Sequence, residues 1–235
     1  MKKIAVLTAL LFAALQIGYA QKVGLVLSGG GAKGAAHIGV IKALEENGIP
    51  IDYITGTSAG AIVGSLYAMG YTPEEMVELM LSEEFSYWQT GTVENEYKYY
   101  FKRPDPTPEF GHFSIDMTDS LQVKASFLPQ SLINPIQMNQ AFMALFSQAT
   151  AKAGWNFDNL FVPFRCVASD IYSKKAIIFK NGDLGDAVRA SMTFPFFFQP
   201  IWKDSVPIFD GGIYDNFPVG PMKVVSYTHL TLPTT

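Results

Sequence analysis

The chain has 235 residues, of which 49% are hydrophobic and 16% are charged. This composition excludes a disordered tail, a collagen-like repeat and a coiled coil, and the length is typical of one large domain. The 17 basic and 21 acidic residues give a formal net charge of −4 and form no basic cluster of the kind that binds nucleic acid. Cys166 is the single cysteine, so the chain can form neither an internal disulfide nor a cysteine-based zinc site.

Residues 1–20 have the pattern of a secretory signal peptide. Lys2 and Lys3 provide the positive start, residues 4–17 are almost entirely apolar, and Gly18 and Ala20 place small residues at a cleavage site. The apolar stretch is short for a membrane-spanning helix, which needs about 20 residues, and an uncleaved anchor is the alternative. The sequence therefore predicts export to the periplasm, the outer membrane or the extracellular space.

Short apolar strands alternate with helical patterns in the first part of the remaining chain. A capping box and a first-turn proline at residues 72–75 (TPEE) predict the start of one further helix. The apolar periodicity predicts strands over 22–27 and 51–54, and helices over 32–47 and 58–69.

Residues 86–160 have a different character. They are rich in aromatic residues, contain a proline-rich piece, and show helical periodicity only over 138–147, which predicts an insertion or lid. Beyond it, the pattern predicts strands over 164–168, 175–180 and 207–209, a turn at 170–173 and a helix over 186–192. Strands that alternate with helices favour an α/β fold, a three-layer α/β/α sandwich with a mainly parallel sheet.

The last eleven residues, 225–235 (VSYTHLTLPTT), resemble the translation of a sequencing adapter. On this interpretation they are a non-native tail, the domain spans residues 21–224, and the chain is a C-terminally truncated fragment. The alternative is a genuine β-strand, because the segment is rich in Thr, Leu, Val and Tyr. We therefore assign no role to His229.

A glycine-rich loop directly follows the first predicted strand. Residues 29–34 read GGGAKG, which matches the glycine fingerprint of a dinucleotide-binding fold. That fingerprint also requires an acidic residue about 20 positions further on, at the end of the second strand. Asp52 has this spacing but lies at the start of its strand, so the loop alone is weak evidence for a nucleotide.

Ser58 lies between Gly56 and Gly60 at a predicted junction from strand to helix. This is the arrangement of a nucleophile elbow, in which small neighbours allow a sharp turn that exposes the serine hydroxyl. The helix N-terminus beyond it favours developing negative charge. An ordinary serine cap beside a glycine-rich turn is the alternative at this point.

A serine nucleophile needs a base. Outside the tail, His37 lies in a predicted helix and His112 in the irregular insertion, and neither has a carboxylate partner nearby in the sequence. Asp210 follows an apolar strand and precedes Gly211 and Gly212, so it is the candidate for a serine–aspartate pair. A surface turn is the commoner use of Asp-Gly-Gly.

The ordered set of motifs resembles the patatin-like phospholipase family, in its bacterial, secreted members. The resemblance covers residues 22–222 and includes ASMTFP at 190–195 and DNFP at 215–218. It implies that Ser58 is the nucleophile and Asp210 the base, with no metal and no cofactor. It also implies an oxyanion hole formed by the backbone amides of Gly29, Gly30, Gly31 and Ala59. Lys33 and Gly34 complete the motif of the glycine loop.

By the same resemblance, the substrate is a phospholipid or another lipid ester, hydrolysed at a membrane surface. Family members that carry a signal peptide often continue into an outer-membrane β-barrel. The resemblance therefore implies such a barrel as a further domain attached to this one. Two other functions stay open: a nucleotide-binding oxidoreductase that uses residues 29–34, and a non-catalytic lipid-binding module.

Overall fold

The computed structural model describes residues 22–92, 112–116, 122–126, 131–223 and 228–232. The predicted signal peptide lies outside these residues. The described helices are α2 (Ala35–Glu46), α3 (Ala59–Ala68), α4 (Pro73–Leu81), α5 (Glu83–Thr90), α6 (Ile136–Lys152), α7 (Leu184–Ser191) and α8 (Val219–Lys223). The strands are β1 (Val23–Leu27), β2 (Tyr53–Thr57), β3 (His112–Asp116), β4 (Gln122–Ser126), β5 (Phe164–Asp170), β6 (Lys175–Phe179), β7 (Ile201–Lys203), β8 (Val206–Asp210) and β9 (Thr228–Leu232).

One central sheet organises the molecule. Its strands follow the order β7-β8-β5-β2-β1-β9, and β6 pairs with the remaining edge of β5. The pairs β9–β1, β1–β2 and β2–β5 are parallel, whereas β6, β7 and β8 are joined in antiparallel pairs. The sheet is therefore parallel around β1 and β2 and mixed beyond β5.

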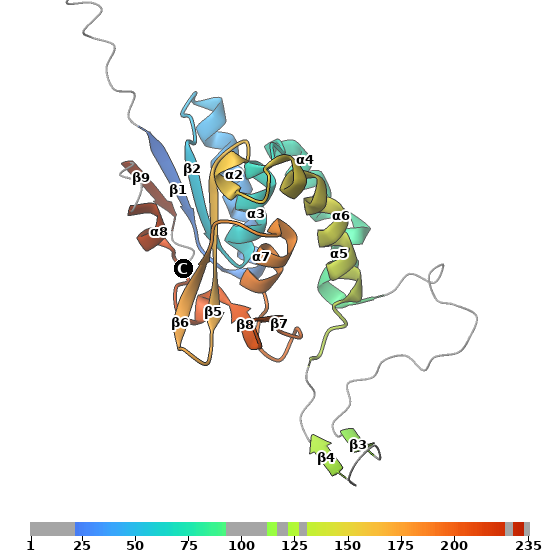
Figure 1. Ribbon diagram of the computed structural model, residues 1–235. Coiled ribbons are helices and arrows are strands. Elements are labelled where there is room, and N and C mark those ends of the chain that lie inside the picture. The colour runs from blue at the N-terminus through green and yellow to red at the C-terminus, as the bar shows by residue number, and fades with distance from the viewer. Residues whose placement is uncertain (1–21, 93–111, 117–121, 127–130, 224–227, 233–235) are drawn as a thin grey trace, which may run out of the picture.

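The helices cover the two faces of this sheet unequally. Helices α3, α6 and α7 lie on one side of it and α8 lies on the other, which confirms the three-layer α/β/α architecture (Figure 1). Val26 of β1 and Tyr53 of β2 form a small second cluster with Met222 of α8. The larger core lies on the side of α3.

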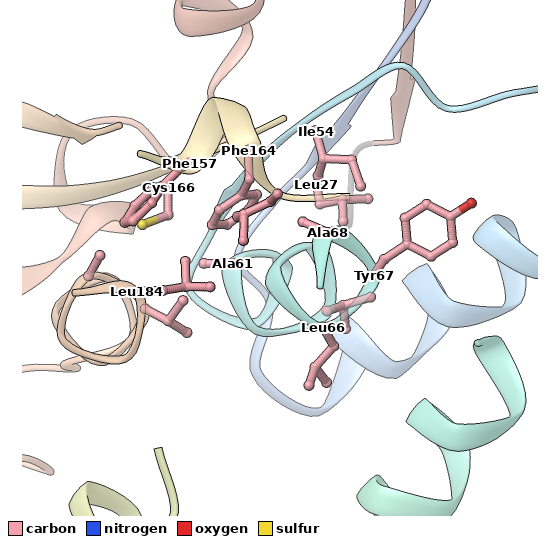
Figure 2. Packing of buried hydrophobic residues seen from close by; sticks show 14 of the residues in the cluster. Leu27, Ile54, Ala61, Leu66, Tyr67, Ala68, Phe157, Phe164, Cys166 and Leu184 are labelled. Carbon is pink, nitrogen blue, oxygen red and sulfur yellow. The ribbon is translucent and has the colours of Figure 1, made fainter. Parts of the chain in front are cut away.

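We call this larger core the apolar layer. Figure 2 shows Leu27, Ile54 and Phe164 of the strands on the side of α3 that carries Ala61 and Ala68. Burial of such side chains is the main stabilising contribution to a fold of this size. Further fully or nearly fully buried members include Ile41, Met76, Phe142, Phe146, Phe157, Cys166, Leu184, Val188 and Ile208.

Local signals in the sequence placed most elements correctly. The capping box at Thr72 is present, because its hydroxyl accepts a hydrogen bond from the amide of Glu75 and the Glu75 carboxylate accepts one from the amide of Thr72. The predicted helix over 32–47 begins differently: residues Gly31–Gly34 form a 3₁₀ turn, and the α-helix starts at Ala35. The second strand also runs further than predicted, to Thr57.

Part of the predicted insertion at residues 86–160 belongs to the main core. Phe142 and Phe146 of α6 are buried in the apolar layer, and their rings pack edge to face with centroids 5.3 Å apart. Strands β3 and β4 form a separate antiparallel pair. Much of residues 93–130 lies outside the described part of the chain.

The predicted tail, residues 225–235, contains a described strand. β9 pairs in parallel with β1, with Thr228 opposite Val23 and Leu232 opposite Leu27. This is the β-strand alternative of the sequence analysis; the adapter origin of the segment stays a prediction. Among the described helices, none combines the length and the apolar character needed to cross a membrane.

Candidate active site

The pairing of β5 brings the ends of two distant strands together. β2 runs parallel to β5 and ends with Thr57 opposite Val167. β8 runs antiparallel to β5 and ends with Asp210 opposite Ala168, the next residue along. The carboxyl ends of β2 and β8 therefore meet head to head beside one strand, and Ser58, which follows Thr57, lies against Asp210.

The hydroxyl of Ser58 donates a hydrogen bond of 2.6 Å to Oδ2 of Asp210. The other oxygen of this carboxylate, Oδ1, accepts a 2.7 Å bond from the amide of Gly212. Asp210 is 6% exposed, and this burial raises the pKa of its carboxyl above the ordinary value, against the opposing effects of the two hydrogen bonds. A raised pKa makes the carboxylate a better proton acceptor.

The backbone of Ser58 is strained, with φ 54° and ψ −121°. Residues with side chains rarely adopt positive φ, so this conformation must be imposed by the surrounding structure. A Cβ on Gly56 would collide with the backbone of Gly60, and a Cβ on Gly60 would collide with the carbonyl of Leu27. The two glycines of the motif therefore let α3 begin directly against β1 and β2.

The glycine loop after β1 approaches Ser58 from the other side. The amide of Gly29 donates to the carbonyl of Asn216 at 3.2 Å, and Nδ2 of Asn216 donates to the Gly29 carbonyl at 3.4 Å. Gly29 was predicted to contribute to an oxyanion hole, but its amide is engaged here. Within the described residues, the amides of Gly30, Gly31 and Ala59 donate to no acceptor.

The remaining motif residues frame these groups. Gly34 is buried against the Cβ of Ala59, where a side chain would push the loop away from α3. Gly211 packs on the carbonyl of Val167. Lys33 is exposed at the end of the loop. We call the assembly of Ser58, Asp210, the glycine loop and the segments 191–193 and 211–216 the serine edge.

The histidines take no part in the described geometry of this site. His37 is 2% exposed, and its Nε2 donates to the carbonyl of Ser28 at 3.0 Å. Burial lowers the pKa of His37 despite this bond, so the ring is neutral at pH 7. His112 and His229 lie on β3 and β9, whose side chains are outside the described part of the structure.

The structure does not support the nucleotide-binding alternative. Asp52 lies at the amino end of β2, where its Oδ2 accepts the amide of Val23 at 2.8 Å. The dinucleotide fingerprint needs its acidic residue at the opposite, carboxyl end of that strand. Among the described residues, no three histidine, cysteine, aspartate or glutamate side chains gather as a metal site would require.

Sequence reasoning missed three residues that hold the serine edge in place. Ser191 accepts the amide of Ser58, the Thr193 carbonyl accepts the amide of Asp210, and Asn216 binds the glycine loop. All three fall in the segments 190–195 and 215–218, which the sequence analysis matched as motif pieces without a role. Periodicity could not single them out, because their partners are distant in the chain.

Comparison with known proteins identifies the family of the chain. The family description "Patatin-like phospholipase" matches residues 25–223. The chain is 29% identical to a patatin-like phospholipase domain-containing protein of Caenorhabditis elegans and 31% identical to the lysophospholipase NTE1 of Pyricularia oryzae, over 86% of its own length in each case. It spans only 12% and 11% of those two proteins.

Among solved structures, VipD from Legionella pneumophila shares the fold, with a TM-score of 0.51 and 17% identity. The match covers 84% of this chain and 47% of VipD. The family match extends over most of the chain, from the second half of β1 through α8. The chain therefore belongs to the patatin-like phospholipase family.

Proposed function

We propose that this chain hydrolyses the acyl esters of lipids, with Ser58 as nucleophile and Asp210 as general base. The observation that carries the proposal is the 2.6 Å hydrogen bond from the Ser58 hydroxyl to a buried carboxylate, at a residue whose backbone is strained. Strained backbone conformations cluster at functional sites, and a nucleophile bonded to its base is the arrangement that acyl transfer needs.

In the first step, the Ser58 oxygen attacks the ester carbonyl carbon while its proton passes to Asp210. The carbonyl oxygen becomes an oxyanion, and the N–H groups of Gly30, Gly31 and Ala59 are the donors available to stabilise it. Ala59 is the first residue of α3, so the positive end of the helix dipole also favours this charge.

The intermediate then collapses to an acyl-serine as the bond to the alcohol oxygen breaks. Asp210 returns its proton to the leaving alcohol. A water molecule attacks the acyl carbon in the second half-reaction, giving up a proton to Asp210, and the serine oxygen leaves with that proton. The products are a carboxylic acid and the regenerated enzyme, and these steps use no metal and no redox cofactor.

An exposed aromatic turn supports a lipid interface beside this site. Phe194, Phe196 and Phe197 are 56%, 68% and 44% exposed, and Phe196 has a positive φ of 70°. Phe194 directly follows Thr193, whose carbonyl binds the Asp210 amide. No charged residue occurs in 190–202, so this surface suits a neutral or zwitterionic membrane better than a polar protein. With the predicted signal peptide, we propose an exported enzyme that acts at a membrane surface.

The experiment that tests the proposal is ester hydrolysis by the purified chain and by Ser58→Ala. Substrates are a soluble chromogenic ester and phosphatidylcholine in vesicles. We expect the alanine variant to fold normally and to lose on the order of a thousandfold or more in turnover, as for other activated nucleophiles. Retained turnover in a folded Ser58→Ala protein would remove Ser58 from the mechanism. Vesicle binding without hydrolysis in the unmodified chain would favour the non-catalytic lipid-binding module.

A further inference from the structure

The segment that leaves α7 contacts both members of the Ser58–Asp210 pair. Ser191, the last residue of α7, is fully buried. Its Oγ accepts the amide of Ser58 at 2.9 Å and donates to the carbonyl of Val167 on β5. Thr57 is the last residue of β2 in the β-ladder, so the Ser58 amide has left the sheet and depends on this hydroxyl.

Two residues later, the same segment binds the base. The carbonyl of Thr193 accepts the amide of Asp210 at 2.8 Å. The Thr193 hydroxyl is fully buried as well, and it accepts a 2.6 Å bond from Nη1 of Arg189 while donating to the Arg189 carbonyl at 2.7 Å. The backbone amides of the nucleophile and the base are therefore both bonded to one short stretch of chain.

Arg189 anchors this stretch to the rest of the molecule. It is 3% exposed and has no carboxylate partner among the described residues. Its Nε donates to Oδ1 of Asn139 on α6 at 3.0 Å, its Nη2 donates to the carbonyl of Gln199 at 3.3 Å, and its guanidinium lies 5.1 Å from the ring centre of Phe198. Burial lowers the pKa of Arg189 to about 10, so it is still cationic at neutral pH.

We propose that Ser191 and Thr193 form a bracket that sets the distance between the Ser58 hydroxyl and the Asp210 carboxylate. Ser191 is the positioning residue whose side chain does this directly. The inference rests on the proposed function, because it concerns the alignment of the same pair. Misplacement of reacting groups by about 1 Å can slow an enzyme a hundredfold, so a bond to the nucleophile's own amide has a kinetic effect out of proportion to its effect on folding.

The competing interpretation is purely structural. A buried amide needs an acceptor, and Ser191 would then serve the fold alone. The two interpretations predict different effects of removing the Ser191 hydroxyl. If Ser191 positions the pair, the folded molecules lose Ser58 reactivity. If Ser191 serves only the fold, fewer molecules fold, and those that do keep their reactivity.

Ser65 provides a matched control. It is also a fully buried serine, and its hydroxyl donates to the carbonyl of Ile62 within α3, away from the pair. Both variants lose one buried, hydrogen-bonded hydroxyl, but Ser191→Ala also leaves the Ser58 amide without its acceptor, so its melting midpoint should fall further than that of Ser65→Ala. Ser191→Cys keeps the size of the side chain and weakens the acceptor, so it is the second variant if the alanine variant folds poorly.

The experiment measures two rates on folded protein. One is ester hydrolysis, and the other is labelling by a fluorophosphonate, in which the Ser58 oxygen bonds to phosphorus, fluoride leaves and Asp210 takes the proton. We expect Ser191→Ala to lower kcat and the labelling rate by ten- to a hundredfold with KM within about twofold. Ser191→Cys should be intermediate, and Ser65→Ala should match the unmodified chain.

The pH profile gives a further readout that a structural role would not move. The hydrogen bond from Ser58 lowers the pKa of Asp210, so weakening it should move the acidic limb of kcat in Ser191→Ala to higher pH. If Ser191→Ala and Ser191→Cys keep the reactivity and the profile of the unmodified chain, the bracket is overturned and the proposed function stands. If the unmodified chain neither hydrolyses esters nor labels at Ser58, the proposed function fails, and the bracket with it.

Discussion

The serine edge and the apolar layer lie on the same sheet but are stabilised in different ways. The apolar layer is built from buried hydrocarbon side chains such as Phe146 and Leu66, with backbones in ordinary helix and strand conformations. The serine edge holds a buried carboxylate on Asp210 and a strained backbone at Ser58. Burying a charge and straining a backbone both lower the free energy of unfolding, so the burial of side chains in the apolar layer must offset the destabilisation that the serine edge causes.

Asp210→Asn, a change in the serine edge, should have the largest effect on activity while leaving the apolar layer intact. The amide cannot accept the Ser58 proton, so we expect ester hydrolysis to fall on the order of a thousandfold or more. Burial raises the pKa of Asp210 in the folded chain above its value in the unfolded chain. The carboxyl therefore stabilises the fold at a pH below the unfolded-state pKa, and this contribution is lost as the pH rises through the folded-state pKa. At pH 7 the neutral amide should therefore raise the melting midpoint.

The measurements for this variant are turnover and thermal melting at pH 7 and at pH 3. The stability gain should be present at pH 7 and shrink at pH 3, where the carboxyl of the unmodified chain is protonated in both states. Hydrolysis by the unmodified chain should rise with pH through a midpoint above 3.8, the ordinary value for aspartate. A variant that is inactive and also less stable at pH 7 would mean that Asp210 supports the fold as a charged group.

Phe146→Ala, a change in the apolar layer, should lower stability and leave activity nearly unchanged. The ring is 1% exposed and packs against Phe142, so its removal leaves a cavity and is expected to lower the free energy of unfolding by about 3–5 kcal/mol. Activity per folded molecule should change by less than about threefold, because the ring packs within the apolar layer, against Phe142. Denaturant unfolding and active-site titration measure the two quantities.

Met143 supplies the control on the same helix. It is 68% exposed, so Met143→Ala should change the free energy of unfolding by no more than about 0.5 kcal/mol. If Phe146→Ala instead abolished activity in folded protein, α6 would be part of the site, through its contact with α7, and the division into two regions would be wrong.

Ser169→Ala should produce the smallest effect, and with the reverse sign. Ser169 lies on β5, two residues beyond Val167, and its fully buried hydroxyl has no hydrogen-bond partner among the described residues. Removing a buried, unsatisfied hydroxyl is expected to raise the free energy of unfolding by about 1 kcal/mol without affecting turnover. Ser65→Ala, which removes a bonded hydroxyl, should lower it by a similar amount. Equal losses in both variants would show that Ser169 has a partner after all.

Much of the site followed from short stretches of sequence. The elbow at Ser58 was predictable because Gly56 and Gly60 are its neighbours in the chain, and the capping box at Thr72 because both partners lie within one helical turn. Asp210 as the partner of Ser58 followed by elimination and by family resemblance. Ser191 and Asn216 could not be assigned in this way, since they contact groups 133 and 187 residues away.

By itself, the sequence determined the alternation of strands and helices, the identity of the elbow serine and the candidate base. These depend on interactions between residues close in the chain, which leave a local pattern. Only the tertiary structure decided that Gly29 is held by Asn216, that α6 belongs to the core, and that β2 and β8 end head to head on β5. Those outcomes depend on contacts between segments far apart in the chain, such as the pairing of β2 with β5 and the bond between Gly29 and Asn216, and no local periodicity encodes such contacts.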